Sequence, residues 1–232
     1  MKNIIQISDC HIDDKTHPMG VDTNNNLLNV IRNIKNIPAD ALLITGDLSH
    51  SGTTKSYEII KKYLSILDTN YIVLPGNHDN IKNINKEFSD NILREYSIGD
   101  WCIISAYSKK NGQVSGYLST DELSQLEDAI NFSNSKHIIV IIHHPPIPMN
   151  SDWDDSLSLE NMDDFFTIIN KYSNIKAILW GHAHQSSEFN HNQVKLISCP
   201  STAIQFDNEQ RIGFNHFSLH DDGNIEYKTI WL

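Results

Sequence analysis

The sequence is poor in arginine and in positive charge generally. Arginine occurs only at positions 32, 94 and 211, and 29 acidic side chains against 18 basic ones leave a formal net charge of −11. A protein that binds nucleic acid needs a basic surface to neutralise phosphates, so this balance argues against a nucleic-acid partner. It also means that something other than arginine must supply the positive charge for any chemistry on phosphate.

Cysteine and long apolar runs are scarce as well. Cys10, Cys102 and Cys199 are scattered and odd in number, which implies neither a disulfide framework nor a thiolate zinc site. No apolar run approaches the roughly 20 residues that a membrane-spanning helix needs. The N-terminal residues also lack the apolar core of a signal peptide. We therefore expect a cytoplasmic protein with no membrane partner.

Short apolar runs alternate with amphipathic segments along the chain. The predicted strands are rich in Ile, Val, Leu, Phe or Trp and cover residues 4–8, 41–45, 71–74, 101–106, 137–142, 177–180, 194–198, 214–219 and 225–231. The predicted helices carry apolar residues at helical spacing and cover residues 22–36, 54–67, 121–131 and 159–172. Ser119 and Glu122 have the spacing of a capping box for the third helix.

This alternation predicts an α/β fold with strands and helices in layers. The helix-poor stretch from residue 194 onward, with a turn at 221–223, predicts closing antiparallel strands. A chain of this length fits one hydrophobic core, so we expect a single domain covering 1–232.

Aspartate, asparagine and histidine follow five of the predicted strands. The motifs are Asp9-Cys10-His11, Gly46-Asp47, Gly76-Asn77-His78-Asp79, His143-His144 and Gly181-His182-Ala183-His184. Because side chains just past the carboxyl ends of strands gather at one rim of an α/β sheet, we expect these motifs to lie together. Imidazole with carboxylate and amide donors suits iron, manganese or zinc better than calcium, which prefers oxygen alone.

The local spacing of residues within these motifs gives two further predictions. In Asp9-x-His11 and His182-x-His184, an extended chain would put both outer side chains on one side and turn the middle residue away. The glycines that precede Asp47, Asn77 and His182 permit tight turns and close backbone approach. Each motif alone is commonly a turn or a half-buried histidine, but five of them in order at strand ends indicate a shared site.

The five motifs resemble those of the calcineurin-like metallophosphoesterase superfamily, and the resemblance covers nearly the whole chain. The sequence is further similar to bacterial class III cyclic nucleotide phosphodiesterases in four places. They are Gly20-Val21-Asp22-Thr23, His144-Pro145-Pro146 followed later by Trp153, the motif 181–184 continued by Gln185, and the stretch from Pro200 to Phe206. The resemblance implies a four-layer α/β/β/α sandwich with a mixed β-sheet core. It also implies hydrolysis of a small cyclic nucleotide, 3′,5′-cyclic AMP, to 5′-AMP.

The resemblance implies a centre of two divalent ions, Fe²⁺ or Mn²⁺, with Zn²⁺ as a further candidate. The implied ligands are Asp9, His11, Asp47 and His184 for one ion and Asp47, Asn77, His143 and His182 for the other, with Asp47 bridging. His78 is then a catalytic histidine beside the phosphate, and His144 supports the site. The implied substrate contacts are His11, Asp47, Asn77, His78, His143 and His184.

The mechanism that follows from this resemblance depends on charge. Two dications about 3.5–4 Å apart lower the pKa of a bridging water, so that hydroxide attacks in line, and they draw charge from the phosphoryl oxygens. A protonated His78 can donate a proton to the departing ribose oxygen. The metal ions would thus supply the positive charge that arginine does not.

Several alternatives stay open. The same centre could hydrolyse another small phosphodiester, such as a 2′,3′-cyclic nucleotide or a glycerophosphodiester, or serve a phosphoprotein phosphatase, a nuclease or a nucleotide pyrophosphatase. The motifs lack the phosphatase Asp-Arg-Gly, and the net charge of −11 opposes a nuclease. A non-catalytic scaffold of this fold would have lost ligands, and none is missing. Both a monomer and a homodimer are compatible with the resemblance.

Other residues have less definite predictions. Close family members have Asp-Ser where this chain has Tyr107-Ser108, so the loop there is expected to differ. Trp153 could cover a pocket, stack on a base or simply pack its segment, and Asp79 could orient a ring or cap a turn. The histidines outside the motifs are expected to be solvated or structural; they are His17, His50, His137, His191, His216 and His220.

Overall fold

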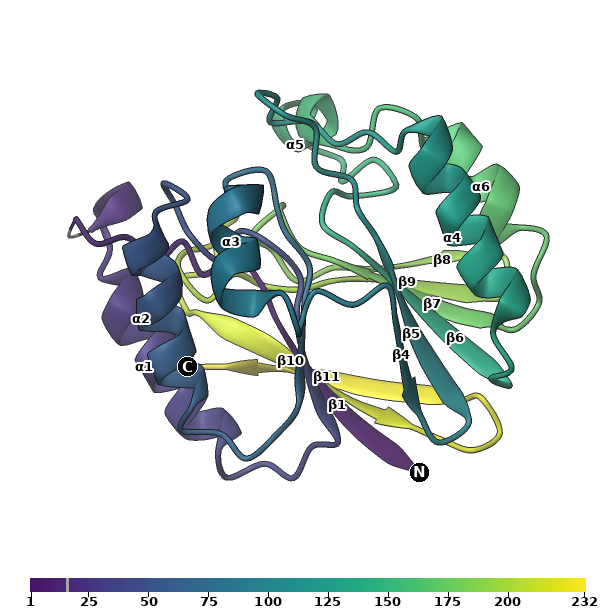
Figure 1. Ribbon diagram of the computed structural model, residues 1–232, viewed down its shortest axis with the longest axis horizontal. Helices are drawn as coiled ribbons and strands as arrows, with labels where there is room; N and C mark the ends of the chain where they lie inside the picture. The colour runs from purple at the N-terminus through teal and green to yellow at the C-terminus, as the bar shows by residue number, and fades with distance from the viewer. Residues whose placement is uncertain (16) are drawn as a thin grey trace.

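Two mixed β-sheets lie at the centre of the computed structural model, with helices on both outer sides (Figure 1). The structure describes residues 1–15 and 17–232. The strands are β1 Lys2–Ile7, β2 Ala41–Ile44, β3 Tyr71–Val73, β4 Glu95–Ile98, β5 Trp101–Ala106, β6 His137–Ile142, β7 Ile175–Trp180, β8 Glu188–His191, β9 Val194–Ser198, β10 Gly213–Leu219 and β11 Ile225–Trp231. The helices are α1 Thr23–Ile34, α2 Thr54–Leu64, α3 Ile81–Phe88, α4 Thr120–Phe132, α5 Asp152–Leu157 and α6 Met162–Ile169, with a 3-10 turn at Pro18–Gly20.

Each sheet combines a parallel region with antiparallel strands at one or both edges. The first sheet runs β11-β10-β1-β2-β3, in which β1, β2 and β3 are parallel and β10 and β11 add an antiparallel edge. The second runs β4-β5-β6-β7-β9-β8, in which only the edge strands β4 and β8 are antiparallel. The motif-bearing strands β1, β2, β3, β6 and β7 therefore all belong to parallel regions, whose carboxyl ends are the usual place for a site.

The central strands are apolar throughout because both of their faces are covered. In β2, Leu42 and Ile44 pack with the helix residues Leu27 and Tyr57, whereas Leu43 packs among residues of the other sheet. Strand β6 divides its alternate residues between two clusters in the same way. The strand period of two thus sends successive side chains into different cores.

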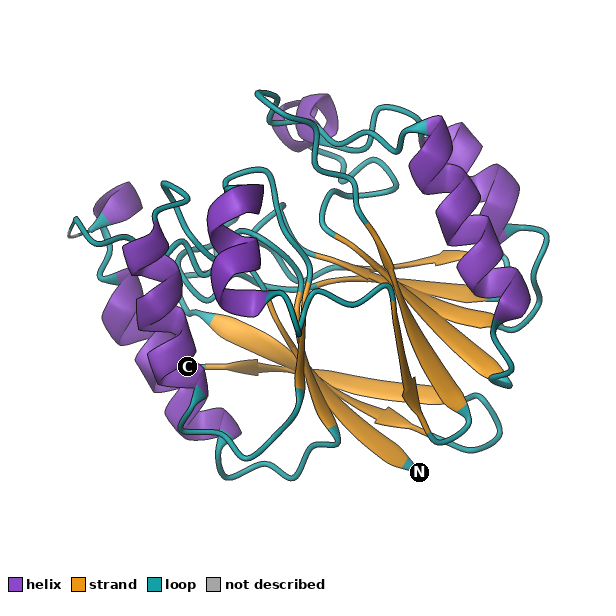
Figure 2. Cartoon of the chain, in the orientation of Figure 1, coloured by secondary structure: helices purple, strands orange, loops and turns teal. Residues whose placement is uncertain are grey.

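Three apolar clusters separate four layers of secondary structure (Figure 2). Helices α1, α2 and α3 cover the outer face of the first sheet, the two sheets pack on each other, and α4 and α6 cover the second. The α/β/β/α sandwich that the resemblance implies is confirmed. Helix α5 lies apart from these layers, near the top of Figure 1.

Side-chain caps define where several helices begin. The Asp22 carboxylate accepts a hydrogen bond from the Asn25 backbone N–H at 3.0 Å, and Ser119 Oγ accepts one from Glu122 N–H at 3.1 Å. The capping box expected at Ser119 and Glu122 is only half formed. The Glu122 carboxylate instead receives two hydrogen bonds from the Arg94 guanidinium, at 2.5 and 2.7 Å.

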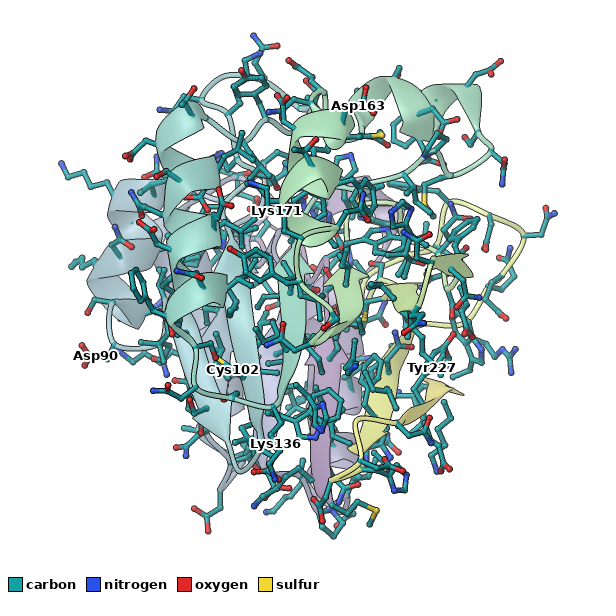
Figure 3. All side chains as sticks on the ribbon, turned by 90° about the vertical axis from the view of Figure 1, so that its right-hand side faces the viewer. Asp90, Cys102, Lys136, Asp163, Lys171 and Tyr227 are labelled. Carbon is teal, nitrogen blue, oxygen red and sulfur yellow. The ribbon has the colours of Figure 1, made fainter. Side chains whose placement is uncertain are left out.

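Figure 3 looks onto the face that α4 and α6 cover. Asp163 lies in the first turn of α6 and Lys171 follows the last turn, so both charges complement the helix dipole. Lys171 Nζ also lies 2.7 Å from Glu127 Oε1 on α4, which joins the two helices. Both side chains are partly exposed, so this ion pair contributes little to stability.

The strands that the sequence did not predict are β4 and β8. Both are edge strands with polar sequences, EYSI and EFNH, and their side chains are largely exposed or half-buried. Edge strands need few apolar residues, which is why the hydrophobic pattern did not reveal them. Helices α3 and α5 were not predicted either, because only two residues of α3 and one of α5 are buried. Among the described residues, no helix is long and apolar enough to cross a membrane.

Candidate metal centre

The five polar motifs meet at one place, between the carboxyl ends of strands from both sheets. His11 Nε2 lies 3.0 Å from His184 Nε2, and Asp9 Oδ1 lies 3.5 Å from the same His184 atom. Asp47 Oδ2 lies 3.5 Å from His143 Nε2 and 3.8 Å from His11 Nε2, so this carboxylate stands between two histidines.

Asn77 and His182 complete the cluster on the His143 side. Asn77 Oδ1 lies 3.0 Å from His143 Nε2 and 3.0 Å from His182 Nδ1. The seven side chains expected as ligands therefore form one continuous group. Two subsets have donor atoms that all lie within 4.8 Å of one another: Asp9 with His11 and His184, and Asp9 with Asp47 and His143.

The backbone that carries these side chains is left-handed. Five of the seven expected ligands have positive φ, namely Asp9 at 53°, His11 at 45°, Asp47 at 49°, His182 at 66° and His184 at 47°. The extended conformation expected for Asp9-x-His11 and His182-x-His184 is therefore wrong, although the outer side chains still converge. Such residues cost about 1–3 kcal/mol each when strained and persist where their surroundings fix them.

Backbone hydrogen bonds hold these turns in place. Asp9 N–H donates to the Gly46 carbonyl and His11 N–H to the Asp47 carbonyl, each at 3.0 Å. The first two motifs are thereby tied side by side. A hydrogen bond of 2.9 Å from His182 N–H to Asp9 Oδ2 then joins the first sheet to the second.

Two glycines allow the close approach that the sequence predicted. A Cβ at Gly46, whose φ is 104°, would overlap the His143 ring. A Cβ at Gly76 would overlap the Asp47 carboxylate and its backbone nitrogen. Any larger residue at either position would have to displace an expected ligand.

Backbone carbonyls fix which nitrogen of two histidines faces the cluster. His143 Nδ1 lies 2.8 Å from the Thr45 carbonyl oxygen, and His184 Nδ1 lies 2.8 Å from that of Ile204. Because a carbonyl only accepts hydrogen bonds, each Nδ1 donates and each Nε2 is left for the cluster. His144 differs, since its Nδ1 lies 2.7 Å from Ser108 Oγ and its Nε2 lies 2.9 Å from the Val114 carbonyl.

The electrostatics of the cluster keep both carboxylates ionised. Burial alone would raise the pKa of Asp9, but the nearby imidazoles of His184 and His143 lower it below the usual value. Burial opposes ionisation of Asp47 as well, yet His143 and His11 hold its pKa well below normal. Burial would lower the pKa of His143, but the Asp47 carboxylate raises it to about 9.

Two buried anions at one place need positive charge. Within residues 1–15 and 17–232, no Lys or Arg forms an ion pair with Asp9 or Asp47. The buried Asp9 Oδ1 also has no hydrogen-bond partner among the described residues. Carboxylate, amide and imidazole donors that converge without a lysine or arginine fit divalent transition ions, and the residues present therefore fit the implied metals.

His78 lies at the exposed edge of the cluster. Its backbone N–H donates to Asp47 Oδ1 at 2.8 Å, and its ring Nδ1 donates to the His50 carbonyl at 2.8 Å. The ring packs edge-on against His11, with 4.8 Å between the ring centroids. The His78 imidazole also forms a group with His11 and His50 in which the donor nitrogens lie within 4.8 Å of one another.

His50 lies beside the cluster, a position that the sequence reasoning missed. Its Nδ1 lies 3.3 Å from His11 Nδ1, and its ring stacks on His78 at 5.0 Å between centroids. Of the two expectations for His50, solvated or structural, these contacts favour a structural role beside the expected ligand His11. The available signal was its position three residues after Asp47, in the same loop.

Asp79 binds the loops rather than a histidine ring. Its carboxylate accepts hydrogen bonds from Leu48 N–H, Ser49 N–H and Gly76 N–H at 3.2, 3.1 and 2.9 Å, and from the Tyr57 hydroxyl at 3.0 Å. It thus closes the turn that precedes it, from Gly76 to Asp79, rather than the next turn. It also ties the loop that carries Asp47 to the loop that carries Asn77. Burial and the nearby Asp47 raise its pKa to about 6.

Contacts of Tyr107 with Glu122 and Arg94 hold the loop that follows β5. Tyr107 N–H donates to Glu122 Oε1 at 2.8 Å, and the Arg94 guanidinium lies 4.5 Å from the centre of the Tyr107 ring. The next residues reach the site. Ser108 contacts His144 as described above, and Lys109 Nζ donates to the Asn77 carbonyl at 2.6 Å.

Comparisons with known proteins show which sequences and folds this chain is similar to. A family model described as calcineurin-like phosphoesterase matches residues 2–186. A probable cyclic nucleotide phosphodiesterase of Vesicomyosocius okutanii subsp. Calyptogena okutanii is 48% identical over 230 residues, or 99% of each chain. The 3′,5′-cyclic adenosine monophosphate phosphodiesterase of Pseudomonas aeruginosa is 30% identical over 96% of this chain and 87% of its own. A dimetal phosphatase structure from Danio rerio has a TM-score of 0.75 at 12% identity, covering 99% of this chain and 98% of that one.

Tyr57→Phe tests the link between the two ligand-bearing loops. The change removes one hydrogen bond to Asp79 and leaves the Asn80 N–H, which donates to the Tyr57 hydroxyl at 2.9 Å, without its acceptor. We expect the free energy of unfolding to fall by about 1–3 kcal/mol in urea denaturation.

The matched control is Tyr63→Phe on the same helix, because the Tyr63 hydroxyl makes no hydrogen bond to any described residue. Its free energy of unfolding should change by less than about 0.5 kcal/mol. Equal losses in the two variants would contradict the role assigned to Tyr57.

Proposed function

Because the chain belongs to the calcineurin-like phosphoesterase family, we propose that it hydrolyses 3′,5′-cyclic AMP to 5′-AMP with the help of two divalent metal ions. The single observation that carries the proposal is the convergence of seven donor side chains, two of which are buried carboxylates that have no Lys or Arg partner among the described residues. The cyclic nucleotide phosphodiesterases that are 48% and 30% identical support this substrate class.

We assign Asp9, His11, Asp47 and His184 to one ion, and Asp47, Asn77, His143 and His182 to the other. The intermediate position of Asp47 Oδ2, between His11 and His143, supports its role as the shared ligand. The approach of Asn77 Oδ1 to both His143 and His182 supports grouping these three side chains. His144 has both ring nitrogens engaged elsewhere, which supports the choice of its neighbour as the ligand.

Two bound dications of this kind supply an activated water and neutralise charge on the phosphoryl oxygens. The side chains of the protein position the general acid, His78. Asp47 holds the His78 backbone through the 2.8 Å hydrogen bond, so the His78 ring keeps a fixed position beside the cluster. The His78 Nδ1 donates a hydrogen bond to the His50 carbonyl. The His78 Nε2 is therefore the nitrogen that can donate a proton to the departing ribose oxygen.

Asp47→Ala and His78→Ala separate metal binding from proton transfer. We expect the Asp47 variant to lose both ions, because it removes the shared ligand. The His78 variant should keep both ions and lose about 10²–10⁴-fold in kcat, which is the usual contribution of a general acid. Metal analysis per chain and turnover of cyclic AMP measure the two effects. Two ions bound to the Asp47 variant would refute the bridging assignment.

A substrate panel tests the reaction itself. Protein loaded with Mn²⁺ or Fe²⁺ is assayed on 3′,5′-cyclic AMP, 3′,5′-cyclic GMP, 2′,3′-cyclic AMP, a glycerophosphodiester and bis(p-nitrophenyl) phosphate. We expect the highest kcat/KM on 3′,5′-cyclic AMP, with 5′-AMP as product. A loaded protein that is inert on cyclic AMP but active on another diester would overturn the substrate assignment and leave the metal centre standing.

His50→Ala tests whether His50 positions a ligand. A metal on His11 Nε2 requires the proton on His11 Nδ1, which can then donate to His50 Nδ1, 3.3 Å away. Loss of such a supporting partner typically costs 10–100-fold in metal affinity, and we expect about tenfold weaker Mn²⁺ binding in competition with a chelator.

The conservative variant His50→Gln keeps an acceptor and should recover part of this affinity. His191→Ala is the control, because His191 lies at the end of β8 and contacts Asn170 instead. Unchanged Mn²⁺ affinity in His50→Ala would show that His50 has no part in orienting His11.

A further inference from the structure

Two exposed aromatic rings lie beside the candidate metal centre. Trp153 on α5 is 56% exposed and Phe206 is 47% exposed, and both belong to segments that carry none of the expected ligands. The Phe206 ring lies flat on the His184 ring, with centroids 4.0 Å apart and an interplanar angle of 4°. The Trp153 ring stands perpendicular to Phe206, with centroids 5.3 Å apart and an angle of 90°.

Two hydrogen bonds with His184, one to its backbone and one from its ring, fix the position of the loop that carries Phe206. Phe206 N–H donates to the His184 carbonyl at 3.1 Å, and the His184 ring Nδ1 donates to the Ile204 carbonyl at 2.8 Å. The loop at 204–206 and His184 are therefore held as one unit. Because these hydrogen bonds are made within the chain itself, the Phe206 ring is preorganised as a surface on which a ligand can bind.

Helix α5 is anchored in a similar way, near the top of Figure 1. Ser151 Oγ caps its first turn by accepting from Asp154 N–H, and the Asp155 carboxylate accepts from Met149 N–H at 2.5 Å. Ser156 Oγ donates to the Trp153 carbonyl at 2.7 Å. The Trp153 backbone is thus held by local hydrogen bonds while its ring is left in solvent.

Large rings that remain exposed next to a polar site indicate a binding surface rather than a core. Trp and Phe gain by covering flat apolar ligands, and the bases of nucleotides stack on such rings without regard to sequence. In a nucleotide, one ribose lies between the phosphate and the base, so the base lies a short distance from the phosphate. In this structure, the Phe206 ring lies between Trp153 and His184, which is one of the expected metal ligands.

We propose that Trp153 and Phe206 form a nucleobase-binding subsite, which holds the base of a nucleotide whose phosphate lies at the metal centre. The inference rests on the proposed function for the location of the phosphate. It assigns a binding site to the base, which is the part of the substrate that the metal ligands do not contact. The two rings contribute to affinity for nucleotides over phosphates that lack a base.

Binding of 5′-AMP and of ribose 5-phosphate to the Mn²⁺-loaded protein tests the subsite without requiring turnover. Both ligands carry the same phosphate and sugar, and only 5′-AMP carries a base. We expect the wild type to bind 5′-AMP about tenfold more tightly in calorimetric titrations, as a base stacked on an aromatic side chain would. Trp153→Ala should reduce that preference to near one, and Trp153→Phe should retain most of it.

Metal content is measured alongside, so that a lost preference is not confused with a lost metal ion. Phe132→Ala is the control, because Phe132 is exposed at the far end of α4 and should leave the preference unchanged. In the wild type, 5′-AMP should also quench tryptophan fluorescence that the Trp153→Phe variant lacks.

The two failures can be told apart. Equal affinity for 5′-AMP and ribose 5-phosphate in the wild type, or an undiminished preference in Trp153→Ala, would overturn the subsite while cyclic AMP hydrolysis still stood. A Trp153-dependent preference in a protein that does not hydrolyse cyclic AMP would support the subsite and overturn the proposed reaction.

Discussion

Asp9 and Asp47 are buried carboxylates that stay ionised without a lysine or arginine partner among the described residues, and much of the structure is arranged around them. Four histidines and one asparagine surround the pair, and each contributes a nitrogen or oxygen aimed at the same place. Burying an unpaired anion costs several kcal/mol, so the arrangement requires compensating positive charge. Divalent metal ions are the species that this donor set fits best.

This constraint also explains the backbone of the site. Donors from two sheets can reach one point only if the chain turns sharply at the end of each strand, and left-handed residues provide those turns. Gly46 and Gly76 leave room for the His143 ring and the Asp47 carboxylate. The four layers supply the rigidity that keeps such strained residues in place, because hydrogen bonds between strand ends determine their conformation from both sides.

A second set of residues surrounds the expected ligands and orients them. Backbone carbonyls fix His143 and His184, His50 faces His11, and Asp79 with Tyr57 joins two of the loops. Trp153 and Phe206 lie outside this set, on the side of His184. Metal binding, proton transfer and recognition of the base would thus be performed by separate sets of side chains. The expected ligands Asp47 and His184 also hold His78 and Phe206 in position.

The sequence by itself determined the parallel core strands, the donor side chains at their ends and the need for cations, because these depend on local periodicity and on residue type. It did not reveal β4 and β8, whose polar side chains suit sheet edges, or the left-handed turns, which break the strand period. Only the tertiary structure placed His50 beside His11, Phe206 beside His184 and Trp153 beside Phe206. Such neighbours come from segments far apart along the chain, and their proximity depends on how the two sheets pack.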